Sequence, residues 1–98
     1  MSDLTVQEAY ERRATAQLLD VREAFEIAES MISGAVHIPM DQLHERLTEL
    51  DKSVEVITVC RSGKRSGQVA DELTAAGFTA HNMAGGMIAW QRAGLPLK

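Results

Sequence analysis

The chain has 98 residues, of which 45% are hydrophobic and 24% are charged, and its formal net charge is −4. This length is typical of one compact domain, residues 1–98, and the composition is that of a globular protein. The negative charge argues against nucleic-acid binding, which normally uses a basic surface. No apolar run approaches the roughly 20 residues that cross a bilayer. The first residues also lack the layout of a signal peptide, so we expect a cytoplasmic protein with no membrane partner.

Short apolar runs alternate with amphipathic segments along the chain, which predicts an α/β architecture. The expected helices cover residues 6–13, 23–29, 43–50, 64–76 and 87–93. The expected strands cover residues 16–21, 35–38, 54–59 and 79–83, with a minimal strand before the first helix. This alternation predicts a mainly parallel sheet of four or five short strands with helices on both faces.

Several local signals support these boundaries. Thr5 and Glu8 have the spacing of a capping box, in which each side chain binds the backbone N–H of the other residue. In the segment 23–29 we expect Phe25 and Ile27 to pack inward. Gly77 follows the helix 64–76, where a left-handed residue commonly ends a helix.

Cys60 is the single cysteine, so no internal disulfide can form. A lone cysteine is either a small buried hydrophobe or a reactive thiol. Cys60 directly follows the strand 54–59, the most β-branched of the chain, and precedes a helix. Ligands of parallel sheets bind beyond the carboxyl ends of the strands, and Cys60 is expected at such an end.

The segment that begins at Cys60 combines three features that favour an anion. Its sequence is Cys60-Arg61-Ser62-Gly63-Lys64-Arg65-Ser66. Gly63 permits a positive φ and a tight turn, and the N–H groups at the start of a helix then converge on one point. Three side chains add positive charge, those of Arg61, Lys64 and Arg65.

A thiol held in this cradle should ionise readily, and the thiolate is the nucleophilic form. The hydroxyls of Ser62 and Ser66 can add hydrogen bonds or cap the helix. The alternative interpretation is a core cysteine beside solvated charges. The coincidence of a glycine, three cations and a helix start at one cysteine favours the reactive thiol.

These seven residues resemble the active-site loop of the rhodanese family. Further motifs of the family follow in order along the chain, as Leu19-Asp20-Val21-Arg22-Glu23, Gly34-Ala35-Val36-His37-Ile38-Pro39, Ala84-Gly85-Gly86-Met87-Ile88-Ala89-Trp90 and Gly94-Leu95-Pro96-Leu97. The resemblance implies a five-stranded parallel sheet and sulfur transfer through a persulfide on Cys60. Met31 and Ser33 depart from the family pattern, which often has histidine and proline at these positions.

The length of the loop distinguishes two activities found on this fold. The resemblance to the sulfurtransferases includes their loop length, which Cys60 to Arg65 reproduces. The cell-cycle phosphatases have one residue more, with an arginine where this chain has Ser66. A smaller ring suits a sulfur atom better than a phosphate group, which favours sulfur transfer.

The expected reaction is that of a thiosulfate sulfurtransferase, with Cys60 as nucleophile and residues 61–66 binding the substrate. The donor is thiosulfate or a related compound, and the acceptor is cyanide in vitro, a cellular thiol or a sulfur-accepting protein. No cofactor is implied. The alternatives are a persulfide carrier, a non-enzymatic regulatory or binding module, and a cysteine phosphatase or arsenate reductase.

Polar residues outside the loop have weaker assignments. Asp20 and Arg22 end the second strand and either orient the loop arginines or form a structural salt bridge that supports the loop; the second is preferred. His37, His44 and His81 show no metal-ligand spacing, so we expect no metal site and structural or solvated roles. Residues 85–86, both glycine, form either a plain turn or a close approach to the active site.

Overall fold

The structure is a computed structural model that describes residues 3–98. The strands are β1 (Asp3–Leu4), β2 (Gln17–Asp20), β3 (Val36–His37), β4 (Val56–Val59) and β5 (Ala80–Met83). The helices are α1 (Val6–Arg12), α2 (Ala24–Ile27), α3 (Leu43–Arg46), α4 (Lys64–Ala75) and α5 (Gly86–Arg92), with 3₁₀ turns η1 (Met40–Gln42) and η2 (Leu47–Glu49) beside α3.

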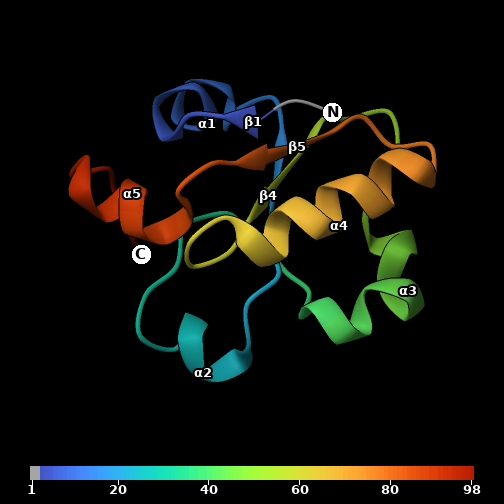
Figure 1. Ribbon diagram of the computed structural model, residues 1–98, viewed down its shortest axis with the longest axis horizontal. Coiled ribbons are helices and arrows are strands. Elements are labelled where there is room, and N and C mark those ends of the chain that lie inside the picture. The colour runs from blue at the N-terminus through green and yellow to red at the C-terminus, as the bar shows by residue number, and fades with distance from the viewer. Residues whose placement is uncertain (1–2) are drawn as a thin grey trace.

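The strands within residues 3–98 all pair in parallel in one five-stranded sheet, in the order β1-β5-β4-β2-β3. Figure 1 labels the first three of these, β1, β5 and β4. The predicted α/β architecture is therefore confirmed, and β1 is the minimal strand expected before the first helix. Strand β4 lies at the centre, between β5 and β2. The chain that leaves its carboxyl end thus emerges in the middle of one edge of the sheet, and it begins with Cys60.

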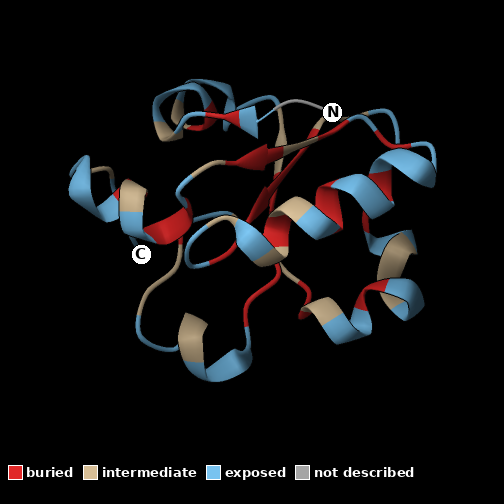
Figure 2. Ribbon diagram, in the orientation of Figure 1, coloured by how far each residue is buried: buried red, intermediate tan, exposed pale blue. Residues whose placement is uncertain are grey.

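Two hydrophobic cores lie on opposite faces of the sheet. Helices α3 and α4 cover one face, where Leu43, Val69 and Leu73 pack against Leu19 and Val56. Helices α1 and α5 cover the other, where the buried side chains are Ala9, Met87, Trp90, Leu18, Ile57 and Met83. The central strands are buried between these layers (Figure 2). None of the helices within residues 3–98 is both long and apolar enough to cross a membrane.

Several predicted helix details are confirmed. Thr5 Oγ1 accepts from the N–H of Glu8, while Glu8 Oε1 accepts from the N–H of Thr5, which completes the capping box. Gly77 has a φ of 96° just after α4. The ends of most other elements differ from the predicted ends by one or two residues, as helix and strand ends commonly do.

Two expectations are wrong. Phe25 does not pack inward, because α2 is a single turn that buries none of its residues, and the Phe25 side chain is 71% exposed. The segment 43–50 is not one helix, since α3 ends at Arg46 and continues as the 3₁₀ turn η2. A short helix gains little cooperative stability, and these tight turns still direct Leu43 and Leu50 into one core.

A buried ion pair fixes the chain after β2. Asp20 Oδ2 accepts from Nη2 of Arg22 at 2.9 Å, and Oδ1 accepts from Nε and from the backbone N–H of Arg22. The same guanidinium donates to the carbonyl of Ser30 at 2.7 Å, and the carbonyl of Arg22 lies 2.7 Å from Nε2 of His37. Asp20 and Arg22 are only 1% and 5% exposed, so each charge depends on its partner for the solvation that it has lost.

We expect Asp20→Asn to lower the free energy of unfolding by roughly 3 kcal/mol, because Arg22 would keep its charge in a buried site without a counter-ion. Urea denaturation measures this change. The matched control is Glu49→Gln, which breaks the exposed ion pair with Arg46 and should cost at most about 1 kcal/mol. A loss for Asp20→Asn no larger than that of the control would contradict a stabilising role for the pair.

Candidate functional site

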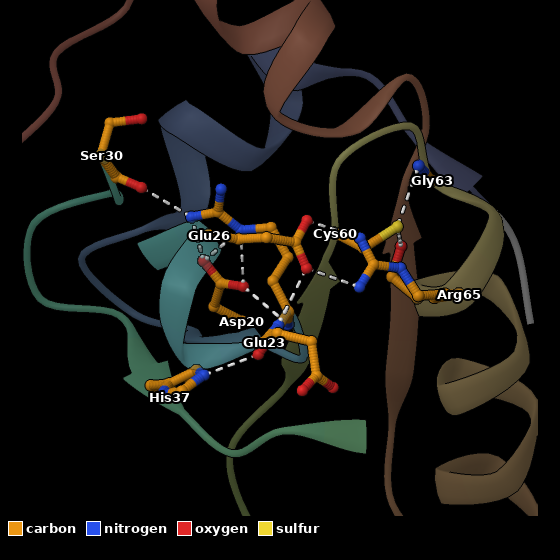
Figure 3. A network of polar contacts seen from close by, with 10 residues as sticks. Asp20, Glu23, Glu26, Ser30, His37, Cys60, Gly63 and Arg65 are labelled. Atoms are coloured by element: carbon orange, nitrogen blue, oxygen red, sulfur yellow. Dashed lines mark hydrogen bonds and ion pairs between the residues drawn. The ribbon is translucent and has the colours of Figure 1, made fainter. Parts of the chain in front are cut away.

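Cys60 lies in the loop between β4 and α4, as the sequence predicted. Its side chain is 1% exposed and faces the inside of the loop. Gly63 is the N-cap of α4 with a φ of 97°, a backbone conformation that favours glycine. This turn brings the backbone N–H of Gly63 to 3.1 Å from Cys60 Sγ (Figure 3).

Two opposing effects act on the thiol. Burial acts to raise the pKa of Cys60, because a thiolate loses its solvation in the interior. Hydrogen bonds from the Ser66 hydroxyl and from the N–H groups of Ser66, Gly63 and Ser62 outweigh burial. The pKa of Cys60 therefore lies below that of an ordinary thiol, which increases the fraction of thiolate at neutral pH.

A second set of polar contacts, which the sequence analysis missed, holds Ser66 and Gly63 in position to donate hydrogen bonds to Cys60 Sγ. The Ser66 hydroxyl lies 3.3 Å from Cys60 Sγ and 2.5 Å from Oδ1 of Asn82 in β5. Asn82 Nδ2 donates to the carbonyl of Gly63, and Thr58 Oγ1 donates to the carbonyl of Ser66. Asn82 is a polar residue in a buried strand, where asparagine is uncommon, and this was the available signal.

The start of α5 closes over the cysteine loop. The N–H groups of Met87 and Ile88 donate to the carbonyls of Cys60 and Arg61, at 2.9 and 3.1 Å. Gly86 has a φ of 56°, and a Cβ added there would overlap both of these carbonyls. The glycine pair therefore permits a close approach to the loop, which was one of the two interpretations of residues 85–86.

The three loop cations have different environments. Arg65 forms a bidentate ion pair with Glu26 of α2, with Nη1–Oε1 and Nη2–Oε2 distances of 2.8 and 2.9 Å (Figure 3). Hydrogen bonding to Arg65 lowers the pKa of Glu26 to about 2, so the carboxylate is charged at every physiological pH. Arg61 and Lys64 are exposed, and neither makes an ion pair within residues 3–98.

The partner of Arg65 was not found from the sequence. Glu26 is the third residue after Glu23, and the two form a capping box in which Glu26 Oε1 accepts from the N–H of Glu23. The Glu-x-x-Glu spacing could have placed Glu26 in the first turn of α2, but not opposite Arg65. Asp20 and Arg22 pair with each other, in line with the preferred interpretation, and Asp20 forms no ion pair with Arg61 or Arg65.

The histidines have separate surroundings, which come from different elements of the fold. His37 Nε2 contacts the carbonyl of Arg22, and His81 Nε2 lies 3.1 Å from Oε2 of Glu55, which also binds Arg12. His44 is exposed on α3. Within residues 3–98, no three histidine, cysteine or acidic side chains are grouped in a way that could hold a metal ion.

A cavity of about 540 Å³ adjoins the cysteine loop on the side of α2. Arg61 and Arg65 contribute to its wall from the loop, Glu26 and Phe25 from α2, and Ile88 from α5. The site thus combines a thiol of lowered pKa, at the end of a central strand, with a cavity large enough for a small molecule.

The comparisons agree with this geometry. A family model described as a rhodanese-like domain matches residues 5–93. The chain is 42% identical over 81 residues to a sulfurtransferase of Allochromatium vinosum, covering 82% of this chain and 76% of that one. It is 33% identical over 100 residues to the thiosulfate sulfurtransferase GlpE of Actinobacillus succinogenes, covering 99% of this chain and 90% of that one.

The fold comparison gives the same assignment. The crystal structure of a rhodanese-related protein from Thermoplasma volcanium matches with a TM-score of 0.95, covering 100% of this chain and 98% of that one at 26% identity. The names of the sequence relatives support sulfur transfer as the general activity. Because the family model spans most of the chain and the relatives match over most of their length, this chain belongs to the family of rhodanese-like domains.

Proposed function

We propose that the chain transfers sulfane sulfur from thiosulfate or a related donor to a thiophilic acceptor, through a persulfide on Cys60. The observation that carries this proposal is the set of hydrogen bonds that converge on Cys60 Sγ and lower its pKa. Such an environment supplies the thiolate without a general base. A single reactive thiol also suits a reducing compartment, so we infer a cytoplasmic location.

In the first step the Cys60 thiolate attacks the outer sulfur of thiosulfate. The S–S bond of the donor breaks, sulfite leaves with the electron pair, and the enzyme holds Cys60–S–S⁻. Negative charge moves to the outer sulfur, where the N–H groups of the loop can donate hydrogen bonds to it. Arg61, Lys64 and Arg65 add positive charge around the same loop, although Arg65 is shared with Glu26.

In the second step the acceptor attacks the outer sulfur. Cyanide yields thiocyanate and regenerates the Cys60 thiolate, whereas a thiol yields a persulfide of the acceptor. The hydrogen bonds that lower the pKa of Cys60 also make its thiolate a better leaving group, because a lower pKa favours departure. The same loop therefore serves both steps.

The other loop residues hold the shape of the site. Gly63 provides the turn and one N–H donor, Ser62 contributes an N–H, and Ser66 contributes its hydroxyl and N–H. Arg22 and Asp20 act at a distance, by fixing the chain that leads to α2 and therefore to Glu26. We assign these two residues a supporting role.

The Ser66 hydroxyl has one proton and two neighbours that can accept it. When Cys60 is a neutral thiol, the proton can bind Asn82 Oδ1, the nearer acceptor at 2.5 Å. When the thiolate forms, the charged sulfur at 3.3 Å becomes the stronger acceptor. Rotation of one hydroxyl thereby stabilises the charge that the reaction requires.

The test of the proposed function is intact-protein mass spectrometry after treatment with thiosulfate in the absence of reductant. We expect a gain of about one sulfur atom per chain, and none in Cys60→Ser, because the only thiol holds the intermediate. Cys60→Ser is nearly isosteric, and its unfolding free energy serves as the folding control. An equal gain in both proteins, or none in the native chain with several donors, would contradict the proposal.

We expect Ser66→Ala to move the pH midpoint of Cys60 alkylation upward, because the variant loses a hydrogen bond that lowers the pKa of the thiol. The rate of alkylation at neutral pH should fall accordingly. The matched control is Thr58→Val, which removes a buried hydroxyl that binds the Ser66 carbonyl and has no hydrogen bond to the sulfur. A midpoint that is unchanged in Ser66→Ala, or raised equally in the control, would contradict the role of the Ser66 hydroxyl in lowering the pKa of Cys60.

A further inference from the structure

The cavity beside the cysteine loop carries little net charge in its wall. Three guanidinium groups contribute to it, those of Arg22, Arg61 and Arg65, and so do three carboxylates, those of Glu23, Glu26 and Glu29. Arg22 also forms an ion pair with the buried carboxylate of Asp20. The cavity is therefore not a strongly positive site of the kind that would concentrate a small dianion.

Arg65 is the loop cation that is most strongly committed to another group. Both of its terminal nitrogens donate hydrogen bonds to the carboxylate of Glu26. In this bidentate arrangement those N–H groups are engaged, and they would otherwise bind an anionic sulfur compound such as thiosulfate. The side chain of Glu26 is only 15% exposed, whereas that of Arg65 is 36% exposed. Any dianion that approaches Arg65 therefore meets the adjacent negative charge of Glu26.

The uncharged part of the wall includes two exposed apolar side chains, Phe25 and Ile88, beside the polar side chains of Ser30 and Gln91. Phe25 and Ile88 are 71% and 37% exposed, and both contribute to the cavity. They come from α2 and α5, which contact the cysteine loop through Glu26 and through the N–H of Ile88 respectively. A volume of about 540 Å³ is within the range of roughly 300 to 1,000 Å³ that holds organic ligands, and it greatly exceeds what thiosulfate needs.

We propose that Glu26 determines donor selectivity by holding Arg65, so that the site prefers a sulfane donor of low charge whose organic body lies against Phe25 and Ile88. This inference rests on the proposed sulfur transfer and names the class of donor. Organic thiosulfonates and organic persulfides have this chemistry. Glu26 is a positioning residue here, since it acts through Arg65.

The reaction with such a donor balances in the same way as that with thiosulfate. For benzenethiosulfonate, the Cys60 thiolate attacks the terminal sulfur, the bond between the two sulfur atoms of the donor breaks, and benzenesulfinate leaves with the electron pair. One negative charge enters with the donor and one leaves with the sulfinate.

The test compares thiosulfate with benzenethiosulfonate as donors, at constant ionic strength and with cyanide as acceptor. Glu26→Gln keeps a side-chain oxygen that can cap Glu23 but removes the charge that holds Arg65. We expect the KM for thiosulfate to fall about three- to fivefold, the effect of one partly exposed ion pair. The KM for benzenethiosulfonate should change less. An unchanged or higher KM for thiosulfate would overturn the role of Glu26.

Glu29→Gln is the matched control, because it removes the same charge from the same cavity and Glu29 forms no ion pair with Arg65. We expect it to lower the KM for thiosulfate by clearly less than Glu26→Gln does. An equal effect would mean that the total charge of the cavity sets selectivity, and it would overturn the assignment to Glu26.

Phe25→Ser tests the proposed contact between Phe25 and the organic group of the sulfur donor, and it does not depend on the folding of the Glu26 variant. We expect kcat/KM for benzenethiosulfonate to fall about fivefold, as for the loss of one aromatic contact, with a smaller effect on thiosulfate. An equal fall in kcat/KM for both sulfur donors would overturn the proposed contact with Phe25. A native chain that forms no Cys60 persulfide with either donor would instead refute sulfur transfer itself, so the two failures are distinguishable.

Discussion

The site depends on the way in which the end of β4 meets the start of α4. Strand β4 lies at the centre of the parallel sheet, and the next residue is the cysteine. The positive φ of Gly63 turns the chain so that backbone N–H groups face Cys60 Sγ, and α5 binds the carbonyls on the outside of the same loop. Hydrogen bonds from the Ser66 hydroxyl and from the backbone N–H groups of this turn together lower the pKa of Cys60 although the thiol is buried.

Much of this arrangement could be predicted from the sequence. The sheet and the position of Cys60 follow from the alternation of apolar runs and amphipathic segments, because each local signal agrees with its neighbours. Gly63 and the loop cations could be recognised because their role is local in the chain. The supporting pair of Asp20 and Arg22 also involves residues two positions apart.

The rest could not be predicted, because it joins residues far apart in sequence. Glu26 meets Arg65 across 39 positions, and Asn82 meets Ser66 across 16. Nothing local in either segment indicates these partners. The exposure of Phe25 was mispredicted for a related reason, since a one-turn helix beside a cavity has no buried face although its sequence looks amphipathic. These missed residues are the ones that tune the thiol and shape the cavity.

The most direct measurement of the central claim is a crystal structure of the thiosulfate-treated protein. We expect one additional sulfur atom bonded to Cys60 Sγ, within hydrogen-bond distance of the N–H groups at the start of α4, because these donors stabilise its negative charge. An additional sulfur that points away from the loop would contradict the role of these donors. A bare Cys60 with thiosulfate bound elsewhere would contradict its role as the sulfur carrier.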